Sequence, residues 1–265
     1  MGIAIFSSSN RGDSFIAAGT VSAIYAVDEN FVIKLHPSSG GFERQAYDIE
    51  VRSYKRPGHH EHIASCEVTE EGLLLERGIC LRTILQSAGS TSDGPSKARE
   101  SPISLSMKLR WAQEAADGLA YIHSKGIIHA DVGCHNMIVN NSNHVKFIDF
   151  AGSGIDSEAP LVCYEWCSFQ PGNEISVCTD IFAFGSMLFE LETGRVPYSE
   201  LEGTMEMGSL ITVVENLFAQ RQFPSVETLA FGSVISCCWN GKYNSMEEVY
   251  RDIACQCENY SEESL

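Results

Sequence analysis

The fold is decided by His129-Ala130-Asp131-Val132-Gly133-Cys134-His135-Asn136, followed by Asp149-Phe150-Ala151-Gly152. Between these stretches, the apolar runs 137–139 and 145–148 flank the polar turn 140–143, a pattern that predicts an antiparallel hairpin. Because a hairpin returns the chain to its starting point, Asn136 and Asp149 are expected to be neighbours.

Asp131 precedes Asn136 by five positions in the same loop, so three oxygen-bearing side chains should converge there. Carboxylate and amide oxygens are the ligands that a hard cation such as Mg²⁺ prefers. A phosphoryl group at such a site would have its charge neutralised by the metal, while Asp131 orients and deprotonates an acceptor hydroxyl.

These stretches resemble the catalytic loop H-R-D-x-x-x-x-N and the metal motif D-F-G of eukaryotic-type protein kinases. Their wording in residues is most similar to small single-domain kinases of fungal type. Further marks follow in the order of that family. Phe31-Val32-Ile33-Lys34 resembles V-A-I-K, and Glu50 lies where the partner glutamate of Lys34 belongs. Leu75-Glu76-Arg77-Gly78 is similar to the hinge, with Leu75 as gatekeeper.

Two later marks also match. Asp180, in Asp-Ile-Phe-Ala-Phe-Gly, resembles the helix start whose aspartate braces the catalytic loop, and Trp239 resembles a late tryptophan of the family. The resemblance covers about residues 16–254. It implies a protein kinase that uses ATP and Mg²⁺ and phosphorylates a protein substrate, with serine or threonine favoured and tyrosine left open.

The resemblance also implies a role for each matching residue. Asp131 would be the catalytic base, assisted by Lys34 and Asn136, and Asn136 and Asp149 would hold the metal. The nucleotide would be bound by Ile16, Gly19, Ile24, Val32, Lys34, Glu50, Leu75, Glu76, Gly78, Asn136 and Asp149.

The chain departs from the family pattern at several positions. The segment 16–22 keeps only Gly19 of G-x-G-x-x-G, which should loosen the cradle for the phosphates. Ala130 replaces the arginine that normally pairs with a phosphorylated activation segment, so switching by phosphorylation there is disfavoured. Gly133 replaces the lysine typical of serine/threonine kinases, and His135 takes the place of the arginine of tyrosine kinases.

The expected fold is α+β with two lobes. A strand-rich N-lobe would span about 1–77, a helical C-lobe about 78–255 and an acidic tail 256–265. Strands are predicted at 23–27, 31–35 and 73–75, and helices at 42–56, about 105–125 and 180–193. The polar stretch 86–102 is predicted to be a surface loop.

The composition of the chain indicates which kinds of binding partner are disfavoured. With 35 acidic and 18 basic residues, the net charge is -17, which argues against nucleic-acid and membrane binding. The start of the sequence shows no signal-peptide pattern, so we expect an intracellular protein. The ten cysteines are scattered and are predicted to be free, mostly buried thiols.

Three other groups carry residue types that can bind a metal. His59-His60-Glu61-His62 lacks the spacing of H-E-x-x-H, and a structural role for its histidines is favoured. The pairs Cys163/Cys167 and Cys255/Cys257 have no complementary pair with zinc-ribbon spacing, so buried thiols are favoured there.

Two alternative functions stay open. A pseudokinase that binds nucleotide without turnover is suggested by the eroded glycine loop. A small-molecule phosphotransferase of aminoglycoside or choline kinase type is suggested by the motif H-x-D-x-x-x-x-N and by Gly133. The Asp180 motif and Trp239 argue for the protein kinase.

Overall fold

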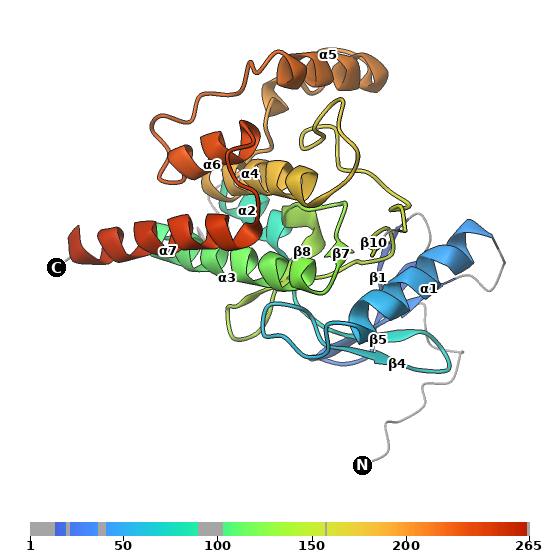
Figure 1. The fold of residues 1–265 in the computed structure, drawn as a ribbon. Helices are drawn as coiled ribbons and strands as arrows, with labels where there is room; N and C mark the ends of the chain where they lie inside the picture. Colours follow the sequence, from blue (N-terminus) through green and yellow to red (C-terminus); the bar gives the residue numbers. More distant parts are fainter. Residues whose placement is uncertain (1–13, 20–21, 37–40, 90–102, 157, 264–265) are drawn as a thin grey trace, which may run out of the picture.

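A computed structural model of the chain describes residues 14–19, 22–36, 41–89, 103–156 and 158–263 (Figure 1). Its first part is a five-stranded antiparallel sheet in the order β1-β2-β3-β5-β4. The strands are β1 Phe15–Ala18, β2 Ala23–Ala26, β3 Phe31–Leu35, β4 Cys66–Val68 and β5 Leu73–Glu76. The predicted hairpin of β2 and β3 is confirmed, and its turn is fixed because Asp28 Oδ1 accepts the backbone N–H of Asn30 and Phe31.

A single helix, α1 Phe42–Lys55, connects β3 to β4 and lies beside the sheet (Figure 1). It agrees with the helix predicted at 42–56. Its buried face includes Ala46 and Ile49, and also the charged Glu50, whose side chain is fully enclosed. A buried carboxylate needs a cation or hydrogen-bond donors nearby, so the sheet must supply one.

The second part of the chain is dominated by helices (Figure 1). They are α2 Leu81–Gly89, α3 Leu105–Ser124, α4 Val177–Thr193, α5 Met207–Ala219, α6 Gly232–Trp239 and α7 Met246–Glu263, with short 3₁₀ turns at Cys134–Asn136 and Ser199–Leu201. Helices α3 and α7 run side by side, as do α4 and α6. One apolar core continues from the sheet into these helices. The predicted two-lobed α+β architecture is therefore confirmed.

Helix α3 follows its sequence signals closely. The Ser104 hydroxyl caps its start by accepting the N–H of Met107 at 3.2 Å. Gly126, just beyond its end, has φ +71°, a conformation that glycine adopts without steric cost. Its apolar residues Leu109, Ala112, Ala116, Leu119 and Ala120 form a stripe that is buried along its length.

Two expectations need correction. The loop predicted at 86–102 begins later, because Leu81 and Leu85 anchor α2 in the core and carry the helix to Gly89; residues 90–102 lie outside the described residues. The expectation of mostly buried thiols is wrong for part of the set, since Cys163, Cys178 and Cys255 are exposed and Cys134, Cys167 and Cys238 are buried.

Two small sheets shape the loop that carries the deciding stretch. Strands β6 Ile79–Cys80, β8 Met137–Val139 and β9 Val145–Phe147 form one, and β7 Ile127–Ile128 pairs with β10 Gly154–Ile155 in the other. The β8–β9 hairpin returns the chain as predicted, since the N–H of Ile148 donates to the carbonyl oxygen of Asn136 at 3.0 Å. In the part of the chain that the structure covers, no helix combines the length and apolarity needed to cross a membrane.

Asp180, near the start of α4, holds the backbone of the loop that carries Asp131. Its fully buried carboxylate accepts the N–H of His129 at 2.9 Å, the N–H of Ala130 at 3.0 Å and the hydroxyl of Tyr164 at 2.7 Å. His123 Nε2 lies 2.8 Å away on the other side. These bonds hold Ala130 at φ +66°, a strained conformation for a residue other than glycine.

Asp180 should therefore make stability depend on pH. Burial alone raises the pKa of Asp180, but the hydrogen bonds and charge of His123 and the other donors outweigh it and lower the pKa below its usual value. A lowered pKa gives stability that is present above the unfolded-state pKa of about 3.9 and is lost as pH falls through the lower folded-state pKa. We predict that Asp180→Asn costs about 3 kcal/mol at pH 7 and weakens the acid dependence, as measured by urea unfolding from pH 3 to 7.

Asp252→Asn is the matched control, because that carboxylate accepts one hydroxyl, from Tyr243, on an exposed face of α7. Equal losses in the two variants would contradict the bracing role of Asp180.

Candidate active site

Lys34 on β3 is the centre of the site. Its ammonium donates to Glu50 Oε1 on α1 at 2.8 Å and to Asp149 Oδ1, beyond β9, at 2.7 Å. The side chains of Lys34 and Glu50 are 3% and 0% exposed, while that of Asp149 is 46% exposed. The ion pair expected between Lys34 and Glu50 is thus present, and the carboxylate of Asp149 faces the open side.

The charges of this cluster stabilise each other. Burial alone lowers the pKa of Lys34, but the charges of Glu50 and Asp149 outweigh it, so the pKa is raised and the ammonium stays charged. Burial raises the pKa of Asp149, but the charge of Lys34 lowers it by more. The pKa of Asp149 is therefore below its usual range. At neutral pH the site therefore holds the charged ammonium of Lys34 and the ionised carboxylate of Asp149.

His36 is a neighbour that the sequence prediction missed. Its Nε2 lies 3.2 Å from Glu50 Oε2, and its ring packs edge-on against Tyr47 of α1. Residues two apart on a strand share a face, so the position of His36 two after Lys34 is the signal that identifies it.

Asp131 and Asn136 form the second half of the site. The amide Nδ2 of Asn136 donates to both the carbonyl oxygen and Oδ2 of Asp131, each at 2.9 Å. Asn136 is buried, whereas the Asp131 carboxylate remains 30% exposed. Asn136 thus orients the carboxylate that was predicted to be the base.

An additional ionic chain starts at the other oxygen of Asp131. His135 Nε2 lies 3.2 Å from Asp131 Oδ1, and its Nδ1 lies 3.2 Å from Glu165 Oε2. Burial lowers the pKa of His135, but the two carboxylates outweigh it and raise the pKa to about 9. His135 is thus an imidazolium that bridges Asp131 and Glu165. The contact with Glu165 could not be expected from the sequence, because His135 and Glu165 are 30 positions apart.

The series of ion pairs continues from Glu165 to Arg82 of α2. Its guanidinium donates twice to Glu165, at 2.7 and 2.6 Å, and twice to Glu190 of α4, at 2.6 and 2.9 Å. Arg82 and Glu165 also line a cavity together with Trp166, Arg195 and Glu200. The planar fork of arginine suits two carboxylates in this way, and it ties the loop around Glu165 to two helices.

The residues predicted to line the nucleotide lie mainly on the first sheet. Val32 and Leu75 are buried partners across β3 and β5, and Ile24 pairs with Lys34 across β2 and β3. Ile16 on β1 is 46% exposed, and the N–H of Gly19 donates to the carbonyl of Ser22. Thr20 and Val21, the rest of the predicted phosphate loop, lie outside the described residues.

The predicted hinge has specific contacts. The Glu76 carboxylate accepts from Lys146 at 2.8 Å and from Asn140 at 3.1 Å, which ties β5 to the β8–β9 hairpin. At Gly78, a Cβ atom would lie 2.7 Å from the carbonyl oxygen of Val139. Only glycine allows this approach without displacement, so the hinge passes close against β8.

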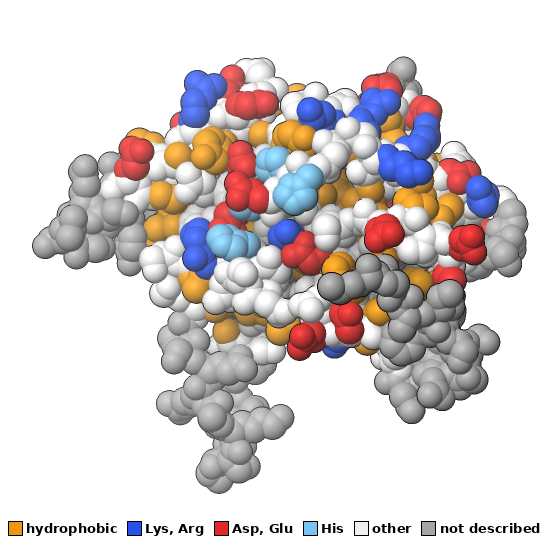
Figure 2. Space-filling model, turned by 90° about the horizontal axis from the view of Figure 1, so that it is seen from below, with side chains coloured by type: hydrophobic (Ala, Val, Ile, Leu, Met, Phe, Trp, Pro, Cys, Tyr) orange, Lys and Arg blue, Asp and Glu red, His pale blue; other side chains and the backbone are white. Residues whose placement is uncertain are grey.

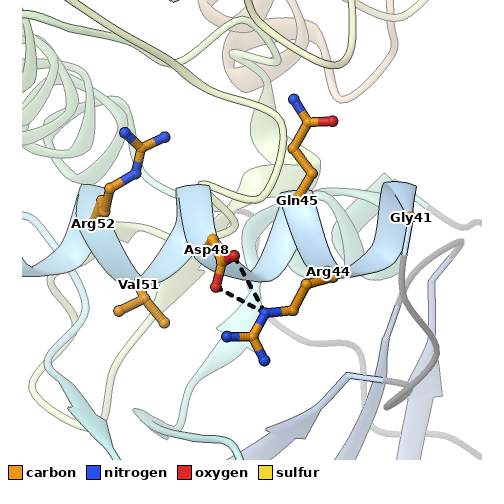
Figure 3. Close-up of a pocket in the computed structure, with 6 residues that line it drawn as sticks. All are labelled: Gly41, Arg44, Gln45, Asp48, Val51 and Arg52. Carbon is orange, nitrogen blue, oxygen red and sulfur yellow. Dashed lines mark hydrogen bonds and ion pairs between the residues drawn. The ribbon is translucent and has the colours of Figure 1, made fainter.

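Two exposed ion pairs hold α1 against the segment after β10. Arg52 donates to both carboxylate oxygens of Glu158, at 2.8 and 2.6 Å, and Arg56 donates to Asp156 at 2.6 Å. In Figure 3, Arg52 and Gln45 project from one side of α1, while Arg44 and Asp48 pair with each other elsewhere on the helix. These contacts favour the position of α1 in which Glu50 reaches Lys34.

The cysteine pairs weighed as metal sites are not supported. Within the described ranges, neither Cys163/Cys167 nor Cys255/Cys257 joins a group of three side chains placed to hold a metal. Cys134, next to His135, is fully buried and its burial raises the pKa of the thiol well above its usual value. A thiol in this state is unreactive.

Comparison with known proteins gives one consistent result. The family model described as "Protein tyrosine and serine/threonine kinase" matches residues 66–251, more than half of the chain. A probable serine/threonine-protein kinase of Dictyostelium discoideum is 33% identical over 116 residues, covering 41% of this chain and 7% of that protein. A serine/threonine/tyrosine-protein kinase of Arabidopsis thaliana is 25% identical over 190 residues, 69% of this chain and 47% of that protein.

A human tyrosine-protein kinase is 26% identical over 183 residues, covering 63% of this chain and 35% of that protein. The chain therefore spans less than half the length of each of these relatives.

Arg82 provides a test of the ionic chain. We predict that Arg82→Met destabilises the fold by about 3 kcal/mol, because it leaves Glu165 and the buried Glu190 without their shared cation. Arg82→Lys should recover part of this loss, since it keeps the charge but not the fork. Chemical denaturation measures both variants.

Arg52→Met is the matched control, since it breaks an arginine–carboxylate pair that is largely exposed and screened by solvent. If Arg52→Met lowers the free energy of unfolding as much as Arg82→Met does, the ion pairs of Arg82 contribute no more to stability than an exposed pair.

Proposed function

The chain belongs to the protein tyrosine and serine/threonine kinase family, and on this basis we propose that it transfers the γ-phosphate of ATP to a serine or threonine hydroxyl of a protein substrate. The observation that carries the proposal is the cluster in which the ammonium of Lys34 bridges Glu50 and Asp149. Beside it, Asn136 orients the Asp131 carboxylate toward the open side.

Magnesium fits the donor set of this cluster. Nδ2 of Asn136 and Oδ1 of Asp149 are engaged with Asp131 and Lys34, which leaves Oδ1 of Asn136 and Oδ2 of Asp149 as hard oxygen donors. Asn136 and Asp149 are therefore the residues that would hold Mg²⁺. The metal would supply neutralisation of the phosphate charge.

Asp131 is the group suited to receive the hydroxyl proton. In phosphoryl transfer the protein contributes mainly positioning and electrostatic stabilisation, and a carboxylate near the acceptor orients it and takes its proton. Asn136 and His135 hold the two oxygens of Asp131 from opposite sides. His135 is thus a positioning residue for Asp131 in this proposal.

Lys34 would orient the phosphates of ATP through its ammonium, and Glu50 keeps that ammonium in place. The adenine would lie between the apolar residues of the first sheet, Val32 and Ile24, and the hinge from Leu75 to Gly78. Ile16 on the edge strand and Gly19 just after it would cover the phosphates. The cluster is complete without a phosphate group on the segment after β10, which agrees with the replacement of the pairing arginine by Ala130.

Preference for serine and threonine is supported by the name of the Dictyostelium relative, while the Arabidopsis relative is named for all three hydroxyl residues. His135 also stands where the tyrosine-kinase pattern has an arginine. We therefore propose serine or threonine, and product analysis distinguishes them from tyrosine.

We predict that Asp131→Asn and Lys34→Met each lower the rate of γ-phosphate transfer by a factor of about 100 or more, because one removes the proton acceptor and the other the phosphate-orienting cation. The measurement is transfer of label from Mg-ATP to the protein itself and to a panel of proteins, with phosphoamino-acid analysis of the product.

Lys108→Met is the matched control, because Lys108 donates to a backbone carbonyl of α4 far from the cluster and its loss should leave the rate unchanged. Label in the wild type that persists in Asp131→Asn would refute the role of Asp131. Transfer to a small alcohol or amine, but to no protein, would favour the small-molecule phosphotransferase. Mg-ATP binding without transfer would indicate a pseudokinase.

A further inference from the structure

The short connection between α1 and β4 carries a group of side chains that the proposed reaction does not use. Glu61 and His62 of this connection meet Asp117 of α3. The Nε2 atom of His62 lies 3.7 Å from Glu61 Oε1 and 3.7 Å from Asp117 Oδ2. All three ligand atoms lie within 4.8 Å of one another. On the face of the molecule shown in Figure 2, histidine side chains lie next to acidic ones.

The separations are those of metal ligands and not of hydrogen bonds. A hydrogen bond between a ring N–H and a carboxylate spans about 2.7–3.2 Å. By contrast, nitrogen and oxygen ligands about 2.0–2.2 Å from a tetrahedral zinc ion lie about 3.4 Å from each other. The 3.7 Å distances around His62 are close to this second value. The three atoms therefore surround a point at which one small cation fits.

His62 is the residue that most needs such a partner. Its side chain is 9% exposed, yet neither ring nitrogen is within hydrogen-bond distance of a described acceptor or donor, and Nδ1 is enclosed without a partner. Burial of an unpaired polar ring is costly. A metal at Nε2 would give that nitrogen the partner that the two carboxylate oxygens, each 3.7 Å away, do not provide.

The backbone holds His62 firmly in this position. The N–H of Phe147 on β9 donates to the carbonyl of His62 at 2.9 Å, and Ile63 forms a bridge with Phe147. On the other side, a Cβ at position 118 would lie 3.0 Å from both the Cβ and the carbonyl oxygen of His62. Gly118 therefore lets the connection approach α3 closely, and the adjacent Asp117 is thereby brought to His62.

His60 supports the set from outside. Its Nδ1 accepts the N–H of His62 at 3.3 Å, so the proton of the neutral ring is on Nε2, which lies 3.5 Å from Asp117 Oδ2. Its ring also stacks on Tyr121 with centroids 4.2 Å apart. An N–H directed at a ligating carboxylate is the usual second layer of a metal site.

We propose that Glu61, His62 and Asp117 form a binding site for a divalent cation of the zinc class, with His60 as a positioning residue for Asp117. One imidazole and two carboxylates suit zinc and its neighbours better than magnesium or calcium, which favour oxygen-only sites. Three protein ligands leave a fourth position for water. Since two ligands precede β4 and one lies on α3, the bound ion ties the two parts of the fold together. It lies apart from the Lys34 cluster and is not part of the transfer reaction.

The test is a Co²⁺ titration of the full-length, chelator-treated protein, followed by displacement with Zn²⁺. Co²⁺ reports its ligands by absorption, and thiolate ligands add charge-transfer bands that nitrogen and oxygen ligands lack. We expect one visible absorption band set without thiolate bands, and Zn²⁺ should remove it. His62→Asn and Asp117→Asn should abolish it, and His60→Asn should weaken Co²⁺ binding about tenfold, the effect typical of outer-layer partners.

Two further variants keep the test decisive. Glu61→Gln changes a side chain that is 77% exposed, so it tests a ligand without endangering the fold, and it should weaken Co²⁺ binding at least about tenfold. His144→Asn is the matched control: His144 contacts a carboxylate of Glu114 at 2.6 Å, a hydrogen-bond distance, and it should leave binding unchanged. Absence of the Co²⁺ bands in the wild type, thiolate bands, or bands that survive His62→Asn and Glu61→Gln would overturn the proposal.

Discussion

The ammonium of Lys34 is buried, and a buried ammonium is stable only when anions surround it. Its partners come from α1 and from the loop after β9, which are distant in the sequence. The sheet that carries Lys34, the helix that carries Glu50 and the hairpin that delivers Asp149 must therefore take one relative arrangement. Much of the remaining structure serves to maintain it, through the ion pairs of α1 with the segment after β10 and through Asp180 beneath the loop of Asp131.

The two halves of the site have different supports. The Lys34 half depends on an ion cluster in which Lys34 and Glu50 are enclosed while the Asp149 carboxylate reaches the open side. The Asp131 half is partly exposed and depends on neighbours that hold each oxygen: Asn136 on one side, and His135 with Glu165 on the other. Arg82 then connects Glu165 to α4, the helix that also carries Asp180. The helical part of the chain thus fixes both the backbone and the carboxylate of the predicted base.

The elements and contacts that follow local rules were predictable from the sequence. The two apolar runs and the polar turn within 137–148 were enough to predict that Asn136 lies beside Asp149, and the apolar spacing of 105–125 was enough to predict helix α3. The pairing of Lys34 with Glu50 came from the resemblance. What could not be predicted depends on tertiary approach: the bridge of His135 to Glu165, the double fork of Arg82, and the meeting of His62 with Asp117. The contact of His62 with Asp117 depends on Gly118, which lets the segment of His62 approach α3. The sequence shows this glycine but not which segment packs against it, and therefore a structural role was predicted for the histidines of 59–62.

The account centres on the claim that the Lys34, Asn136 and Asp149 cluster is built to hold ATP together with magnesium. The most direct measurement is calorimetric titration of the protein with ATP in the presence of Mg²⁺ and in the presence of chelator, beside the Asp149→Asn variant. The account predicts binding that weakens at least about tenfold, or 1.4 kcal/mol, without Mg²⁺, and a variant that no longer responds to the metal. ATP binding that is equally strong with and without Mg²⁺, or equal in the variant, would contradict it.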